Sequence, residues 1–164
     1  MRKFVLLIPA LILLNGCFAS VSHYGGTARV LDQNGVPCFA LKDSGFSDWT
    51  VSFLQVSRLD QGGQKGEILW VDGIDAPRPV INKKDCILWR QAFENVDAQM
   101  HELPPAIEQL HSGLIYSVQM NTSRVGDDRS GRWYSSHFCL SQSPSGGRVV
   151  HDLGVKPDAC PVAN

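Results

Sequence analysis

The feature that most restricts the fold is a series of short apolar runs, each followed by residues that favour turns. In Trp49–Val56 apolar and polar side chains alternate, as in a strand with one buried face. Asn34-Gly35 is the strongest local hairpin signal. Comparable runs are Thr27–Leu31, Val36–Leu41, Glu67–Asp72, Pro77–Ile81, Cys86–Trp89, Tyr116–Asn121, Trp133–Leu140 and Arg148–Leu153. The pattern predicts an all-β chain, an immunoglobulin-like β-sandwich of about eight short strands.

Little helix is expected. Only Phe93–Met100 and Ala106–His111 have a composition that favours helix, and each would form one or two turns. The polar segment Thr122–Arg132 is predicted to be a loop between two strands, and Arg148–Leu153 is expected to pair back as a hairpin.

One spacing is typical of the tyrosine corner of β-sandwiches. Leu110, Gly113 and Tyr116 follow one another at intervals of three residues. In such corners the tyrosine hydroxyl bonds to the backbone just upstream and fixes the crossing between sheets. The alternative is a surface tyrosine at the start of a strand.

The N-terminus predicts export and lipidation. Arg2 and Lys3 precede the apolar run Phe4–Leu14, which is too short to span a bilayer and is typical of a signal peptide. Leu14-Asn15-Gly16-Cys17 looks like a lipobox, in which cleavage occurs before a cysteine that carries acyl chains. The alternative is plain secretion, with Cys17 following the cleavage region by chance.

This interpretation divides the chain into three parts. Residues 1–16 form the signal peptide, residues 17–26 a lipidated tether, and residues 27–164 a single β-sandwich domain. Phe18 favours the periplasmic face of the outer membrane, because an aspartate there would resemble an inner-membrane retention signal. The mature chain holds 13 basic and 16 acidic residues, a net charge of −3, and we therefore expect no binding to nucleic acid.

Four cysteines remain after cleavage. An even number in an exported protein predicts two disulfides, for which three connectivities exist. We favour Cys38 with Cys139, because first and last strands are often neighbours in sandwiches, which leaves Cys86 to pair with Cys160. Metal binding is not expected, since the cysteines are far apart and the five histidines are scattered singly.

The chain shows none of the common catalytic motifs. It has no Gly-x-Ser-x-Gly, Ser-x-x-Lys or His-Glu-x-x-His sequence and no phosphate-binding loop. We therefore expect a protein without enzymatic activity and without a cofactor. The four tryptophans either pack in and around the core or form a platform for carbohydrate; they are Trp49, Trp70, Trp89 and Trp133.

A set of short motifs carries a family resemblance. Together with the lipobox, these are Gly35-Val-Pro-Cys38-Phe39, Asp85-Cys86-Ile87, Leu110-x-x-Gly113-x-x-Tyr116-Ser-Val and Tyr134-x-x-x-Phe138-Cys139-Leu140. Their order and spacing, from about Thr27 to Leu140, resemble the immunity periplasmic lipoproteins of type VI secretion systems. The resemblance implies a small β-rich protein that binds and neutralises a protein toxin delivered into the periplasm, while its lipid holds it to the membrane.

Two loops are candidate contacts for such a toxin, because interfaces are centred on aromatic and arginine side chains. They are Arg58–Gly66 and, preferably, Arg124–Trp133, which gathers Arg124, Arg129, Arg132 and Trp133. The alternative for each residue is a solvated polar loop.

Two other functions stay open: an accessory envelope lipoprotein, such as a pilotin or assembly factor, and an inhibitor of lysozyme-type hydrolases.

Overall fold

The computed structural model describes residues 25–42, 48–60, 63–73, 80–82, 85–91, 110–157 and 159–161. The predicted signal peptide, Cys17 and nearly all of the predicted tether lie outside this part of the chain. So do the predicted helix Phe93–Met100 and most of Ala106–His111. Within the described residues, no helix has the length and apolar character needed to cross a membrane.

The described residues form nine strands and no helix, which confirms the all-β, sandwich-like prediction. Most strands lie where the alternating pattern predicts them, but several are longer than expected, up to 16 residues in β8. The strands are β1 (Gly26–Gln33), β2 (Val36–Leu41), β3 (Trp49–Leu59), β4 (Lys65–Gly73), β5 (Val80–Ile81), β6 (Ile87–Leu88), β7 (Ile115–Arg124), β8 (Asp127–Gln142) and β9 (Arg148–Gly154).

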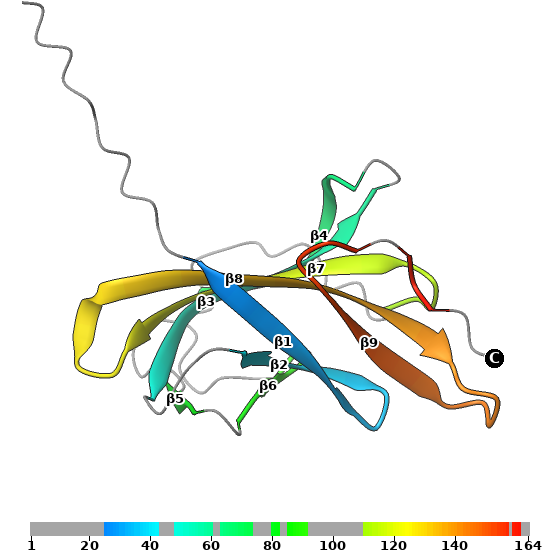
Figure 1. Ribbon diagram of the computed structural model, residues 1–164, viewed down its shortest axis with the longest axis horizontal. Helices are drawn as coiled ribbons and strands as arrows, with labels where there is room; N and C mark the ends of the chain where they lie inside the picture. The colour runs from blue at the N-terminus through cyan, green and yellow to red at the C-terminus, as the bar shows by residue number, and fades with distance from the viewer. Residues whose placement is uncertain are drawn as a thin grey trace, which may run out of the picture.

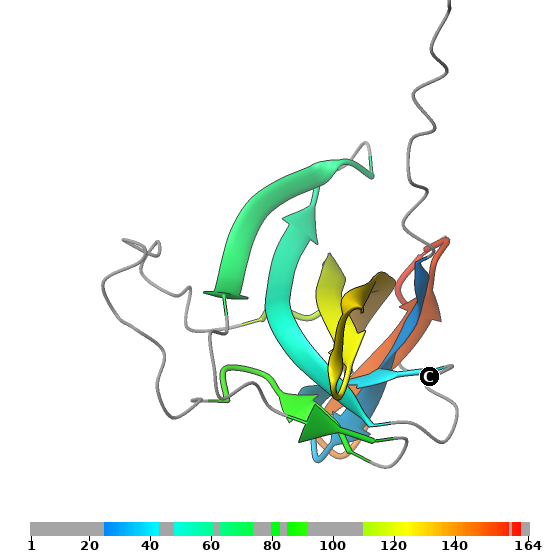
Figure 2. The same ribbon diagram turned by 90° about the vertical axis from the view of Figure 1, so that its left-hand side faces the viewer.

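All nine strands belong to one mixed sheet that curls over on itself (Figures 1 and 2). The strand order is β4-β3-β7-β8-β1-β2-β6, with β5 paired to β3 and β9 paired to β8. The turn to the second layer occurs at β1, whose first residues pair in parallel with β8 while the rest pairs antiparallel with β2. The predicted hairpin of Arg148–Leu153 on the preceding strand is confirmed by the β8–β9 register.

The core fills the space inside this curl, because alternate residues of the long strands point inward. Its largest fully buried side chains are Trp49, Tyr116, Tyr134, Phe39, Phe138, Leu54, Ile87 and Met120. Trp70 and Trp89 pack against this core at its rim, with their rings 5.4 Å apart. Three of the four tryptophans therefore serve packing, whereas Trp133 remains 38% exposed.

The Asn34-Gly35 turn joins β1 to β2 as predicted. Both residues have positive φ, 57° and 81°, which the two-residue hairpin requires. The Gly35 N–H donates to Asp32 Oδ1 at 2.6 Å. A Cβ at position 35 would lie 2.8 Å from the Arg148 carbonyl oxygen, so the close packing of β9 also requires glycine here.

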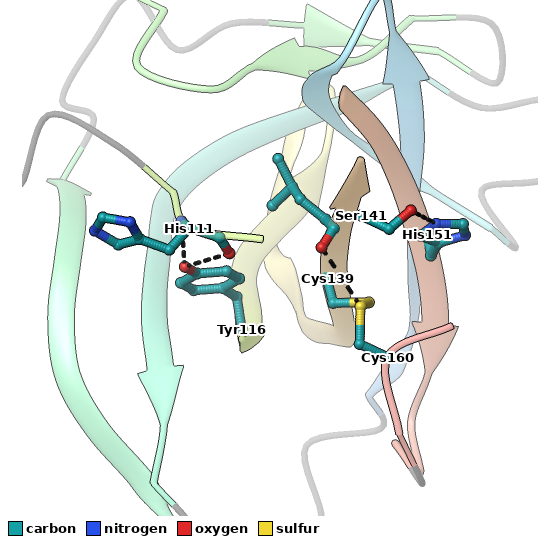
Figure 3. Close-up of a disulfide and its surroundings, with 7 residues drawn as sticks. His111, Tyr116, Cys139, Ser141, His151 and Cys160 are labelled. Carbon is teal, nitrogen blue, oxygen red and sulfur yellow. Dashed lines mark hydrogen bonds between the residues drawn. A yellow bond between two sulfur atoms is a disulfide. The ribbon is translucent and has the colours of Figure 1, made fainter. Parts of the chain in front are cut away.

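Tyr116 forms the predicted corner (Figure 3). Its side chain is 1% exposed, and its ring stacks on Phe138 at 5.3 Å. The His111 N–H donates to the hydroxyl at 2.7 Å, and the hydroxyl donates to the His111 carbonyl oxygen at 3.2 Å. Burial raises the pKa of Tyr116, against smaller lowering effects of the His111 backbone bond and Arg58, so the donating form of the hydroxyl is the one favoured in the fold.

The predicted disulfide pairing is wrong. The bonds join Cys38 to Cys86 and Cys139 to Cys160, with Cα atoms 5.4 and 5.8 Å apart. The reason is strand order: β2 lies on the far side of β1 from β8, and pairs Cys38 with Leu88 of β6 instead. Two disulfides in one small domain indicate an oxidising compartment outside the cytoplasm.

Candidate functional site

The preferred contact segment is a hairpin and not the predicted loop. β7 runs to Arg124 and β8 begins at Asp127, and these two residues pair across a turn in which Gly126 has φ of 81°. Val125-Gly126 is not one of the usual hairpin dipeptides, which explains why the sequence pattern missed it. The hairpin forms one end of the long axis of the molecule (yellow, Figure 1).

Two of the predicted contact residues meet on one aromatic ring. The guanidinium carbons of Arg124 and Arg132 lie 5.6 and 5.5 Å from the centroid of Trp49, which is itself buried. Both arginines remain exposed to solvent. Each cation–π contact contributes about 0.5–1 kcal/mol at a site of this kind. The pair therefore covers the end of the core and holds two positive charges in defined positions.

Trp133 lies on the opposite face of the sheet, because consecutive residues of β8 alternate in direction. Its ring contacts the Phe53 ring edge-on at 5.6 Å. The side chain of Arg129 lies outside the described part of the structure. The structure thus divides the predicted set: Arg124 and Arg132 share one face, and Trp133 belongs to another.

The second predicted contact loop begins and ends within strands. β3 extends to Leu59 and β4 begins at Lys65, so the first two and last two residues of Arg58–Gly66 belong to paired strands. Arg58 and Glu67 form an ion pair of 3.2 Å across the hairpin, with both side chains nearly half exposed. Exposed pairs of this kind contribute between zero and about 1 kcal/mol. The positive charge of Arg58 is balanced by Glu67, whereas the β7–β8 hairpin holds two arginines over one tryptophan ring.

The structure also brings together a serine and a histidine that the sequence pattern did not relate. Ser141 Oγ of β8 and His151 Nε2 of β9 lie 2.8 Å apart, close to the Cys139–Cys160 disulfide (Figure 3). A serine beside a histidine is the first requirement of a nucleophile and its base. The residues are ten apart in the chain and carry no motif, so only the β8–β9 register reveals them.

The nearest acid to this pair in sequence does not complete a triad. Asp152 follows His151 but points to the other side of β9, where its Oδ1 accepts hydrogen bonds from Ser136 Oγ and the Gly154 N–H. In the described ranges no group of three or more potential metal ligands occurs. The Ser141–His151 contact accordingly fastens β9 to β8, as a hydrogen bond between neighbouring strands does.

The site on the β7–β8 hairpin thus rests on geometry: two arginines over a buried tryptophan at one end of a disulfide-bonded β domain. In comparisons with protein-family models, with curated proteins and with solved structures, nothing matches this chain.

Proposed function

We propose that the protein is a lipid-anchored immunity protein of the periplasm that binds and neutralises a toxin delivered by a type VI secretion system. Two observations support the proposal. The motifs from Gly35 to Leu140 resemble the immunity periplasmic lipoproteins of such systems, and the two disulfides fit an extracytoplasmic protein. The lipobox at Cys17 supports anchoring, with the periplasmic face of the outer membrane as the proposed location.

The observation that carries the binding proposal is the Arg124–Arg132 pair. A side chain that is already held in place loses little conformational entropy when a partner binds, and arginine is enriched among the residues that dominate binding energy. Both guanidinium groups are held by the Trp49 ring and remain accessible. The pair therefore suits a toxin surface that presents carboxylates, over an interface of about 800 Å² per partner.

The same pair favours a second candidate, an inhibitor of lysozyme-type hydrolases. Retaining enzymes of this kind act through two carboxylates that lie about 5–5.5 Å apart. Two guanidinium groups, each within 5.6 Å of the Trp49 centroid, offer one cation for each carboxylate of such a pair. The two candidates differ in their target, and inhibition of a purified lysozyme by the protein would support the second.

The test of the main proposal is a titration of protection. The experiment begins by searching the neighbouring genes for a candidate toxin. Cells that secrete that toxin into their own periplasm should survive when the protein reaches one equivalent of toxin. Replacing both Arg124 and Arg132 with alanine should weaken protection, and Arg124→Lys with Arg132→Lys should restore it in part, because lysine keeps the charge and loses the planar fork. Arg29→Ala, an exposed arginine of β1, is the matched control.

Circular dichroism of each variant separates a binding defect from a folding defect. Full protection far below one equivalent would mean turnover and would contradict the proposal. Unchanged protection by the folded Arg124→Ala, Arg132→Ala variant would remove this hairpin as the contact surface.

A further inference from the structure

The outer face of the sheet carries an open groove that the toxin-binding proposal does not use. Its volume is about 710 Å³, within the range of small-ligand sites. It lies where β1 begins beside the middle of β8 (Figure 1). The residues that line it include Thr27, Gln119, Trp133, Tyr134, Ser135 and Val155.

The groove has walls that the fold holds in place. On one side β1 approaches β8 so closely that a Cβ at Gly26 would overlap the Tyr134 ring, and only glycine fits there. On the other side Val155 follows β9, where His137 Nδ1 lies 3.0 Å from the Gly154 carbonyl oxygen. The Cys139–Cys160 disulfide then ties the segment beyond Val155 to β8.

The strand registers align the side chains of this face in two rows. Phe53, Asn121 and Trp133 are successive partners across β3, β7 and β8. Paired residues of neighbouring strands point to the same face, so these three lie side by side. The second row runs across the same strands into β1 and consists of Gln55, Gln119, Ser135 and Thr27.

The chemistry of these rows is neutral and rich in hydrogen-bonding groups. Amides and hydroxyls supply both donors and acceptors, and none of the described side chains in the two rows or in the groove lining is charged. The Trp133 indole is 38% exposed and is held edge-on by Phe53. Anionic ligands are usually held by arginine or lysine, so this lining does not suit them.

We propose that this groove binds a neutral oligosaccharide, with a sugar ring packed on the Trp133 indole and its hydroxyl or acetamido groups bonded to Gln119 and Ser135. The C–H groups on one face of a sugar ring are attracted by the negative face of an indole. The inference is independent of the toxin, because Trp133 and the Arg124–Arg132 pair occupy opposite faces.

The test is calorimetric titration of the full mature protein, in a detergent without a sugar headgroup, with a tetramer of N-acetylglucosamine. The tetramer should bind, and Trp133→Ala should weaken its affinity by about tenfold or more, the loss expected of an aromatic contact. Gln119→Ala should weaken it less. Ile68→Ala, which removes a side chain of similar exposure (41%) on β4, should leave affinity unchanged.

Two further titrations test whether the site is separate from the arginine pair and whether it prefers neutral sugars. The arginine double variant should bind the tetramer as the native protein does, which separates this site from the proposed function. A tetramer of galacturonic acid, which is anionic, should bind more weakly than the neutral sugar. Failure of the native protein to bind the neutral tetramer at millimolar concentration, equal affinity of the folded Trp133→Ala variant, or preference for the anionic sugar would each overturn the inference.

Discussion

Removing one oxygen atom tests the tyrosine corner. Tyr116→Phe deletes the hydroxyl that accepts from the His111 N–H and donates to the His111 carbonyl oxygen. The ring keeps its place against Phe138, since its shape does not change. His111 is exposed, so water replaces part of what its backbone loses. The expected cost is therefore that of about one net hydrogen bond, about 1 kcal/mol.

Urea and thermal unfolding of the native and variant proteins measure this cost. A loss of about 1 kcal/mol lowers the melting temperature by about 3–5 °C in a domain of this size. Tyr116→Leu removes the stacked ring as well and leaves a cavity, so it should cost about 3 kcal/mol. If Tyr116→Phe lowers the unfolding free energy less than Tyr116→Leu does, the first loss measures the hydroxyl and the difference between the two measures the ring.

The pH dependence of the unfolding free energy gives a second measure of what the Tyr116 hydroxyl contributes to stability. Burial raises the pKa of Tyr116 above its ordinary value of 10.0, so the unfolded chain loses this proton at a lower pH than the folded protein does. The resulting stabilisation is complete below pH 10 and is lost as the pH rises further. The difference in unfolding free energy between native protein and Tyr116→Phe should therefore shrink above pH 10. A variant as stable as the native protein at pH 7, or a difference that grows with alkalinity, would refute the reasoning.

Two other predictions concern the anchor and the disulfides. Cys17→Ser should block processing and move the protein out of the membrane fraction, because no acyl chain can attach; unchanged cleavage and fractionation would contradict lipidation. Replacing Cys38 and Cys86 with alanine should cost about 4 kcal/mol and replacing Cys139 and Cys160 about 3 kcal/mol in urea unfolding, because the first bond closes a longer loop, with separations of 48 and 21 residues. The opposite order would show that loop length does not govern these bonds.

Local patterns predicted most of the strands. Alternation places Trp49 and Val51 inside the curl, but a β-bulge between Val51 and Phe53 shifts the pattern, so that Leu54 and not Phe53 is buried. The Asn34-Gly35 hairpin needs only the backbone freedom of its own residues. The corner at Tyr116 is equally local, since its hydroxyl reaches five residues back. Sequence therefore predicts these features well, because each depends on residues that are close together in the chain.

The predicted contact set shows where such reasoning ends. Arg132 and Trp133 are neighbours in sequence, and treating their segment as a loop put them on one surface. Once the segment is a strand, the period of two sends them to opposite faces. Arg132 then lies with Arg124 over the Trp49 ring, whereas Trp133 lines the groove beside β1.

The sequence by itself determined the all-β class, most of the strand positions, the Asn34-Gly35 turn and the tyrosine corner. Only the tertiary structure decided which cysteines pair, which arginines meet on Trp49, and which side chains line the groove. The physical reason is that these contacts join residues distant in the chain, through the order and register of strands. Alternation specifies which face of a strand is buried, and it contains no information about which strand lies beside it.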